Sequence, residues 1–287
     1  MTTIEAPTSA ALNTTWQNAP TDTINAGGVV FAYRQLGPST GVPVVFLTHL
    51  AAVLDNWDPR VVDGIAAKHR VITFDNRGVG ASSGATPATI QEMARDAVTF
   101  IRALGLDQVD LFGFSMGGMI AQVIARQQPQ LVRKIILAGT GPAGGEGIDK
   151  VTRITYLDTA RGLLTRQDPK QFLFFTRTPN GRRAGKEFLA RLEERRNGRD
   201  KAISVRSFRA QLKAIHRWGQ QKPGDLASIQ QPVLVMNGDS DKMVPTKNTV
   251  DLHRRLPNSR LIIYPDAGHG GVFQFHEDFV KRALEFL

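Results

Sequence analysis

Residues 109–118 constrain the fold of this chain more than any other stretch of its sequence. An apolar run enters Gly113-Phe114-Ser115-Met116-Gly117, and a helical pattern follows at once through residues 119–125. This order predicts a strand, a sharp turn at Ser115 and then a helix, with flanking glycines that leave room for neighbouring segments. The Ser115 hydroxyl should therefore be exposed at a helix N-terminus, where the helix dipole favours negative charge.

Strand and helix patterns alternate along most of the chain. Continuous apolar or β-branched runs bounded by turn residues are typical of buried parallel strands, and apolar residues at helical spacing indicate helices between them. The expected strands lie at residues 23–25, 29–36, 44–48, 71–75, 109–114, 134–138, 232–236 and 261–264, with a helix at 89–104. The first two strands should pair antiparallel through Gly27 and Gly28. This pattern predicts an α/β fold with a mostly parallel central sheet flanked by helices.

An acid and a histidine follow two of the later strands. Asp239 and Asp241 come after the strand at 232–236, and His269 comes after the strand at 261–264. A serine, an acid and a histidine in this chain order can form a nucleophile, an orienting acid and a general base. Either aspartate could supply the acid from its position alone, and Asp239 has the alternative role of a turn former.

These motifs together resemble the α/β-hydrolase family, in particular its small bacterial serine hydrolases of the esterase, haloperoxidase and C–C hydrolase type. The resemblance covers roughly residues 24 to 287. Its motifs lie at residues 48–51, residues 75–82, the turn at Ser115, and the Gly-x-x-Asp and Gly-His pairs that end in Asp241 and His269. The resemblance implies a catalytic triad of Ser115, Asp241 and His269, and it favours Asp241 over Asp239.

The resemblance also implies a helical cap inserted between the strand that follows the Ser115 helix and the strand that bears the acid. We expect residues 23–139 and 225–287 to form the core, 140–224 the cap, and 1–22 a flexible tail. Residues 161–222 carry 17 Lys or Arg and five acidic residues, whereas the whole chain has a net charge of +10. The basic excess therefore lies in the cap. A solvated helical surface explains it most simply, and attraction of an anionic substrate is the alternative. No recognised nucleic-acid motif accompanies it.

An oxyanion hole requires two backbone N–H groups near the nucleophile. The motif positions suggest Met116 and Ala51. The sequence departs from its relatives at Leu50, where they usually have glycine, so the Ala51 donor is less well supported than the Met116 donor. Candidate substrate-contacting residues are Leu50, Trp57, Phe114, Phe174 and Phe175.

Other polar residues are expected to be structural. Asp75 and Arg77 belong to a loop after a central strand, and His49 should anchor the oxyanion loop. The remaining histidines are too scattered to suggest a metal site, and the chain has no cysteine. We expect neither a metal nor a cofactor. The scattered histidines are His69, His216, His253 and His276.

The sequence thus predicts a carboxylesterase-like serine hydrolase that cleaves an ester or related acyl bond of a small molecule through an acyl-enzyme. Lactone or C–C bond hydrolysis remains open, as does a small-molecule sensor that retains the triad. We expect no membrane partner, because no run of 18 apolar residues occurs. We expect no nucleic-acid partner, because the basic cap carries no recognised nucleic-acid motif. A cytoplasmic location is expected, because no signal peptide is visible. No feature predicts an oligomeric state.

Overall fold

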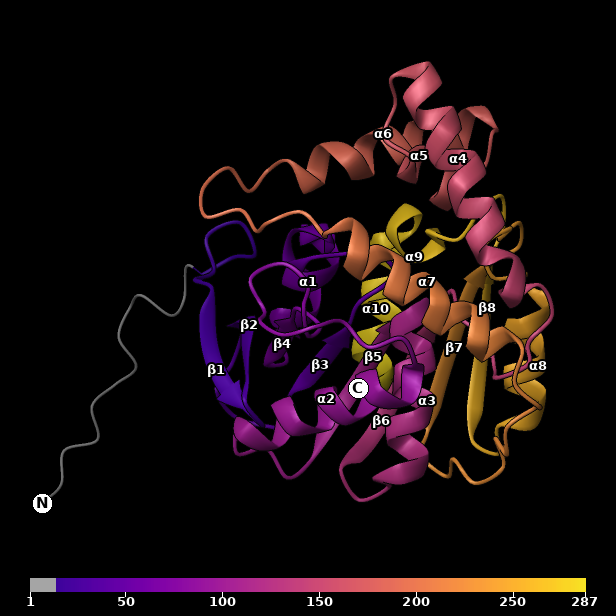
Figure 1. Ribbon diagram of the computed structural model, residues 1–287. Helices are drawn as coiled ribbons and strands as arrows, with labels where there is room; N and C mark the ends of the chain where they lie inside the picture. The colour runs from indigo at the N-terminus through magenta and orange to yellow at the C-terminus, as the bar shows by residue number, and fades with distance from the viewer. Residues whose placement is uncertain (1–13) are drawn as a thin grey trace, which may run out of the picture.

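The computed structural model describes residues 14–287 and is organised around one eight-stranded sheet (Figure 1). The strand order is β1-β2-β4-β3-β5-β6-β7-β8. The β1–β2 and β2–β4 pairs are antiparallel and the other five are parallel. The strands are β1 (Asp22–Ala26), β2 (Val29–Leu36), β3 (Val44–Leu47), β4 (Val71–Phe74), β5 (Val109–Phe114), β6 (Val132–Ala138), β7 (Val233–Gly238) and β8 (Ser259–Tyr264). The predicted α/β class with a mostly parallel sheet is confirmed.

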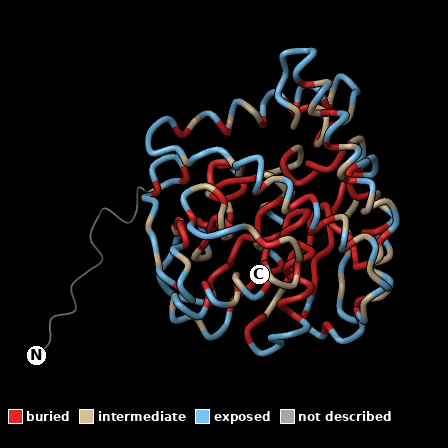
Figure 2. Tube along the Cα trace, viewed as in Figure 1, coloured by how far each residue is buried: buried red, intermediate tan, exposed pale blue. Residues whose placement is uncertain are grey.

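Helices cover both faces of the sheet, so its central strands are buried on both sides (Figure 2). The helices are α1 (Pro59–Ala66), α2 (Ile90–Ala103), α3 (Met116–Gln127), α4 (Val151–Thr165), α5 (Lys170–Phe174), α6 (Pro179–Leu192), α7 (Val205–Gly219), α8 (Lys247–Arg255), α9 (Gly271–Gln274) and α10 (His276–Phe286). Short 3₁₀ helices lie at Leu54–Asn56 and Ile148–Lys150. The predicted helix at 89–104 corresponds to α2, whose first turn is capped by Thr89.

Two hydrophobic cores result from the alternation of side chains along the strands. In β3, Val45 and Leu47 join the core beneath α2 and α3, whereas Val44 and Phe46 join the core beneath α1 and α10. Successive side chains of a strand point to opposite faces, so an unbroken apolar run contributes to both cores. This is why the central strands carry no polar alternation.

Four helices from α4 to α7 lie between β6 and β7 in the chain. In Figure 1, α4, α5 and α6 stand above one end of the sheet, and α7 crosses the front of the molecule. These helices occupy the segment predicted to form a cap. Their placement matters because Ser115, at the end of β5, shares a pocket with side chains of α4, α5 and α7.

The predicted tail needs correction in its last nine residues, while residues 1–13 lie outside the described part. Trp16 is buried at 1% exposure, and β1 begins at Asp22. The Trp16 amide donates to Asp63 of α1, and Arg195 donates to the carbonyl oxygens of Trp16, Gln17 and Ala19. A buried tryptophan removes a large apolar surface from water, which holds this segment against the core.

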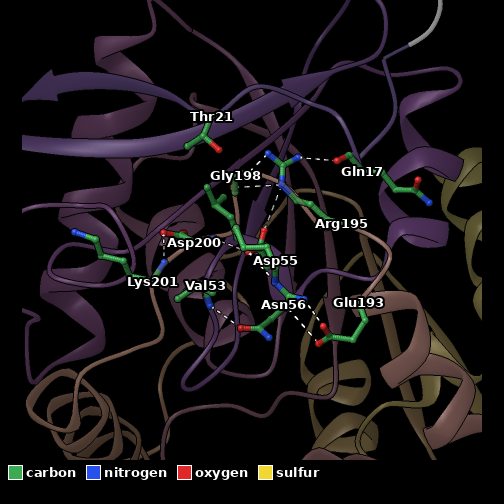
Figure 3. A network of polar contacts seen from close by, with 12 residues as sticks. Gln17, Thr21, Val53, Asp55, Asn56, Glu193, Arg195, Gly198, Asp200 and Lys201 are labelled. Atoms are coloured by element: carbon green, nitrogen blue, oxygen red, sulfur yellow. Dashed lines mark hydrogen bonds and ion pairs between the residues drawn. The ribbon is translucent and has the colours of Figure 1, made fainter.

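A buried ionic network connects this region with the cap segment that follows α6 (Figure 3). Asp55 accepts a 2.6 Å hydrogen bond from Arg34 and lies within ion-pair distance of Arg195 and Arg199. The amide of Asp200 donates to the same carboxylate. A buried charge is tolerated only when it is paired and hydrogen-bonded, so this network fixes where the segment from 195 to 200 meets the core.

Candidate active site

The turn at Ser115 adopts the strained conformation that the sequence predicts. Ser115 has φ 56° and ψ −116°, a backbone conformation that side chains rarely adopt. A Cβ on Gly117 would lie 1.8 Å from the carbonyl oxygen of Leu47, and a Cβ on Gly113 would lie 2.5 Å from the carbonyl oxygen of Gly117. Both positions therefore require glycine. The turn presents the Ser115 hydroxyl at the N-terminus of α3.

Hydrogen bonds connect Ser115, His269 and Asp241 in a buried chain. The Ser115 Oγ lies 2.9 Å from His269 Nε2, and His269 Nδ1 lies 2.7 Å from Asp241 Oδ2. The other carboxylate oxygen, Asp241 Oδ1, accepts from the amides of Met243 at 2.8 Å and Val244 at 3.0 Å. A carboxylate can only accept here, so Nδ1 carries the proton and Nε2 is free to accept from the serine. This arrangement can deprotonate a serine during attack on a carbonyl group.

The sheet topology explains why these residues meet. The chain passes from β3 to β4 on one side and then returns to β5 on the other side of β3. Ligands of open parallel sheets bind in the crevice that such a reversal leaves at the carboxyl ends of the strands. The loops after β5, β7 and β8 carry Ser115, Asp241 and His269 to that same edge.

Asp239, the alternative acid, faces a different set of groups. Its carboxylate accepts from the amides of Asp266 at 3.0 Å and Ala267 at 3.3 Å, and from the Ser240 hydroxyl. These bonds connect the turn after β7 to the turn after β8. Asp239 thus stabilises two turns, whereas the imidazole is bonded to Asp241.

The two predicted oxyanion donors differ in their surroundings. Met116 is the first residue of α3, where an N–H has no partner within the helix. Ala51 has φ 64°, and its N–H donates to Gln211 Oε1 at 2.8 Å. Gln211 belongs to α7 and is fully buried. The Ala51 N–H can therefore donate to a substrate oxygen only when its hydrogen bond to Gln211 is broken.

The hydrogen bond between Gln211 and the Ala51 N–H could not be predicted from the sequence. The residue lies 160 positions after Ala51, within an ordinary amphipathic helix. Only the packing of α7 over the oxyanion loop brings the two groups together.

His49 anchors the loop at residues 48–51 that carries Ala51, the predicted oxyanion loop, as expected from the sequence. Its Nδ1 donates to the Leu50 carbonyl oxygen at 2.8 Å, and its ring packs edge-on against Phe114 and Phe174. Burial in these apolar surroundings lowers the pKa of His49 from 6.5 to about 3. The ring is therefore neutral at physiological pH.

A pocket of about 370 Å³ opens over Ser115 and His269. The core contributes the oxyanion loop and Met243, while the cap contributes mainly apolar side chains. Lys170, which also lines the pocket, is paired with Asp168 at 3.0 Å. The uncharged cap residues in the wall are Thr155, Thr159, Pro169, Leu173, Phe174, Ile203, Val205 and Phe208. A mostly apolar pocket of this size suits a small organic molecule.

Two of the five predicted substrate contacts, Leu50 and Phe174, line this pocket. The other three, Trp57, Phe114 and Phe175, do not, and the prediction was wrong for them. Trp57 packs against Phe46 in the core, and Phe114 is fully covered by neighbouring rings, including those of Phe174 and His269. Phe175 is 3% exposed and borders a separate hollow. An apolar residue near a site can belong to the pocket or to the core, because the sequence does not show the direction in which its ring points.

Asp75 and Arg77 have the structural roles that their loop position predicted. Asp75 is fully buried and accepts from the amides of Leu54 at 2.9 Å and Ala81 at 3.3 Å. Burial, together with the nearby carboxyl of Asp200, raises its pKa well above the usual value. Arg77 pairs with Asp96 at 2.8 Å. Among residues 14–287, no group of three or more histidine or acidic side chains is arranged to hold a metal ion.

No helix in the described part of the chain is both long enough and apolar enough to cross a membrane.

Several known proteins are similar to this chain in sequence or in fold. An alpha/beta hydrolase fold protein from Chitinophaga pinensis superposes with a TM-score of 0.90 at 39% identity, over 95% of this chain and 98% of that one. A candidate non-heme bromoperoxidase of Mycobacterium tuberculosis is 28% identical over 86% of this chain and 94% of its own. A candidate carbamate hydrolase of Agrobacterium fabrum is 27% identical over 80% and 87%, respectively.

The sequence profile of the alpha/beta hydrolase fold family matches residues 42–275, which is most of the chain. The strained serine turn, the strand order and these relatives agree with that match. The protein belongs to the alpha/beta hydrolase fold family.

Proposed function

We propose that this protein is a serine hydrolase that cleaves an ester or related acyl bond of a small molecule. The observation that carries the proposal is the Asp241–His269–Ser115 hydrogen-bond chain at the base of an apolar pocket. Each member is at most 6% exposed, so the chain is shielded from water. Such shielding strengthens the electrostatic interactions on which the chemistry depends.

In the proposed first half-reaction, Ser115 Oγ forms a bond to the substrate carbonyl carbon while His269 Nε2 takes the hydroxyl proton. Asp241 stabilises the resulting imidazolium and fixes the ring orientation. The carbonyl oxygen becomes an oxyanion, which the Met116 N–H stabilises and which also attracts the Ala51 N–H away from Gln211. His269 then gives its proton to the leaving alcohol oxygen as the C–O bond breaks, and an acyl-enzyme remains.

Water completes the cycle in the second half-reaction. His269 Nε2 takes a proton from the water as its oxygen bonds to the acyl carbon. The second tetrahedral species collapses, the Ser115 Oγ–acyl bond breaks, and the proton returns to Ser115. The free acid then leaves the site.

The composition of the pocket favours an uncharged substrate. Lys170 is the one lysine or arginine among the described lining residues, and Asp168 neutralises it. The remaining wall is mostly apolar, so an anionic group would lose its hydration without gaining an unpaired cation. We therefore propose a neutral acyl substrate.

The proposal is tested by Ser115→Ala. We expect turnover of p-nitrophenyl esters to fall on the order of 10⁴-fold or more, because the nucleophile is lost while binding groups remain. Ser228→Ala, at an exposed serine outside the pocket, is the matched control and should retain full activity. Retention of most activity by Ser115→Ala would refute the mechanism.

A labelling experiment separates an enzyme from a sensor that retains the same residues. A fluorophosphonate should label Ser115 in the unaltered protein. Without the fluorophosphonate, the same protein should turn over an ester many times. Labelling without turnover on any ester or lactone of a graded series would favour the sensor.

A further inference from the structure

The cap contains a second hollow whose wall is strongly cationic. It has a volume of about 300 Å³ and is lined by Arg161, Arg177, Arg182 and Lys186, with no acidic side chain in its wall. The neighbouring acids are engaged elsewhere: Asp168 pairs with Lys170, and Glu187 lies 3.9 Å from Arg183. None of the four cations forms an ion pair with any residue in the range 14–287.

The hollow is separate from the substrate pocket. The two share no lining residue, although both are bordered by α4 and α5. Thr176, which lines the cationic hollow, donates a hydrogen bond to Asp266, whose carboxylate lines an adjoining hollow together with Thr176 and Arg177. The charges of Arg161, Arg182 and Lys186 have no carboxylate among the residues that line their hollow.

A buried amide in the same wall has an unused donor. Gln171 is 7% exposed, and its Nε2 has no hydrogen-bond partner among the described residues. A Cβ on Gly185 would lie 2.4 Å from this nitrogen, so the amide packs directly on the backbone of α6. Glycine in a helix interior is destabilising, and here it provides the space that the amide occupies.

The placement of the cations is unfavourable without an anion. Arg182 and Lys186 are four residues apart in α6, so they lie on one face of the helix and repel one another. Arg182 also lies near the N-terminus of α6, where the helix dipole disfavours positive charge. The Arg161 guanidinium is held 4.5 Å from the centre of the Phe172 ring, which restricts its orientation. Like charges on one helix face and a cation at a helix N-terminus are both unfavourable, and such unfavourable placements are typical of a binding site.

We propose that this cationic hollow, formed by Arg161, Arg177, Arg182, Lys186 and Gln171, binds a compact diphosphate group. Guanidinium groups match phosphate oxygens in pairs, and a lysine supplies a further charge. The hollow has room for a diphosphate, and the four cations would neutralise its multiple negative charges.

Calorimetry with inorganic pyrophosphate, at physiological ionic strength held constant with sodium chloride, tests this proposal. We expect one pyrophosphate to bind per chain. The double variant Arg177→Gln and Arg182→Gln should weaken binding roughly tenfold or more, because it removes two charge-assisted contacts. A parallel titration with ADP identifies the source of the group. Tighter binding of ADP indicates a nucleotide, and equal binding indicates the diphosphate alone.

The matched control is the double variant Arg196→Gln and Arg206→Gln. It also removes two exposed cap arginines, but neither lines the hollow. Its pyrophosphate affinity should change less than about twofold, because ionic screening weakens attraction beyond the contact distance. Absence of pyrophosphate binding, or equal losses in the two double variants, would overturn the proposal. Binding is measured without turnover, so the result does not depend on the proposed hydrolase activity.

Discussion

The two ring nitrogens of His269 have different partners, and this difference defines the role of each neighbour. Nδ1 faces the Asp241 carboxylate at 2.7 Å, whereas Nε2 faces the Ser115 hydroxyl at 2.9 Å. The carboxylate therefore selects the tautomer in which Nε2 is basic. Two backbone amides hold Asp241 in turn, so the orientation of the ring follows from the turn after β7.

Asp241→Asn tests this dependence at the scale of a single residue. The amide can donate to Nδ1 and favour the wrong tautomer, so we expect kcat to fall on the order of 10³- to 10⁴-fold. Asp239→Asn, two positions earlier, should lower kcat much less, because Asp239 bonds only to turn groups. Steady-state kinetics of both variants on one p-nitrophenyl ester give the comparison. The reverse ranking would assign the acid to Asp239.

At the scale of elements, α7 connects the cap with the chemistry of the core. Its Gln211 side chain accepts the Ala51 N–H at 2.8 Å, while Phe208 of the same helix lines the substrate pocket. A substrate oxygen that uses the Ala51 amide must compete with Gln211 Oε1. The position of one cap helix thus controls whether the Ala51 N–H, the second proposed oxyanion donor, is free to donate.

Two substitutions of Gln211 with opposite expected effects test this competition. Gln211→Met removes the competing acceptor and should raise kcat about twofold to tenfold, since a typical hydrogen bond contributes about 1 kcal/mol. Gln211→Glu should lower kcat tenfold or more, because a carboxylate holds the amide more strongly and repels the oxyanion. Single-turnover measurements of acylation give both values. A decrease in both variants would show that Gln211 supports the loop instead of competing.

At the scale of the whole molecule, buried titratable groups couple the stability of the fold to pH. His49 lies at 4% exposure against two phenylalanine rings, and its pKa falls from 6.5 to about 3 on folding. Between these two values the unfolded chain binds a proton that the folded chain does not. The free energy of unfolding therefore decreases as the pH falls below 6.5.

Chemical denaturation at pH 7 and pH 5 measures this coupling. His49→Asn keeps a donor near the Leu50 carbonyl but cannot titrate. Relative to this variant, the unaltered protein should lose about 2 kcal/mol of unfolding free energy between pH 7 and pH 5. Asp75, whose raised pKa has the opposite effect on stability, is common to both proteins and cancels. An identical pH dependence in the two proteins would contradict the assignment of a low pKa to His49.

Local patterns determined the sheet, the strained turn at Ser115 and the positions of Asp241 and His269. Each of these residues follows a strand, and the carboxyl ends of parallel strands meet at one edge of the sheet. Short-range rules of strand, turn and helix therefore predicted that Ser115, His269 and one of the two aspartates come together, and the family resemblance favoured Asp241 over Asp239.

Tertiary packing alone decided the contacts that involve distant segments. It placed Gln211 on the Ala51 amide, brought the Trp16 carbonyl oxygen to Arg195, and packed Trp57 in the core instead of the pocket. It also gathered separate cations of α4 and α6 around one hollow. Helical periodicity shows which face of a helix is apolar, but the partner of that face depends on how helices far apart in the sequence pack. Contacts of this kind have no local signal, because neither residue alone carries the information about the other.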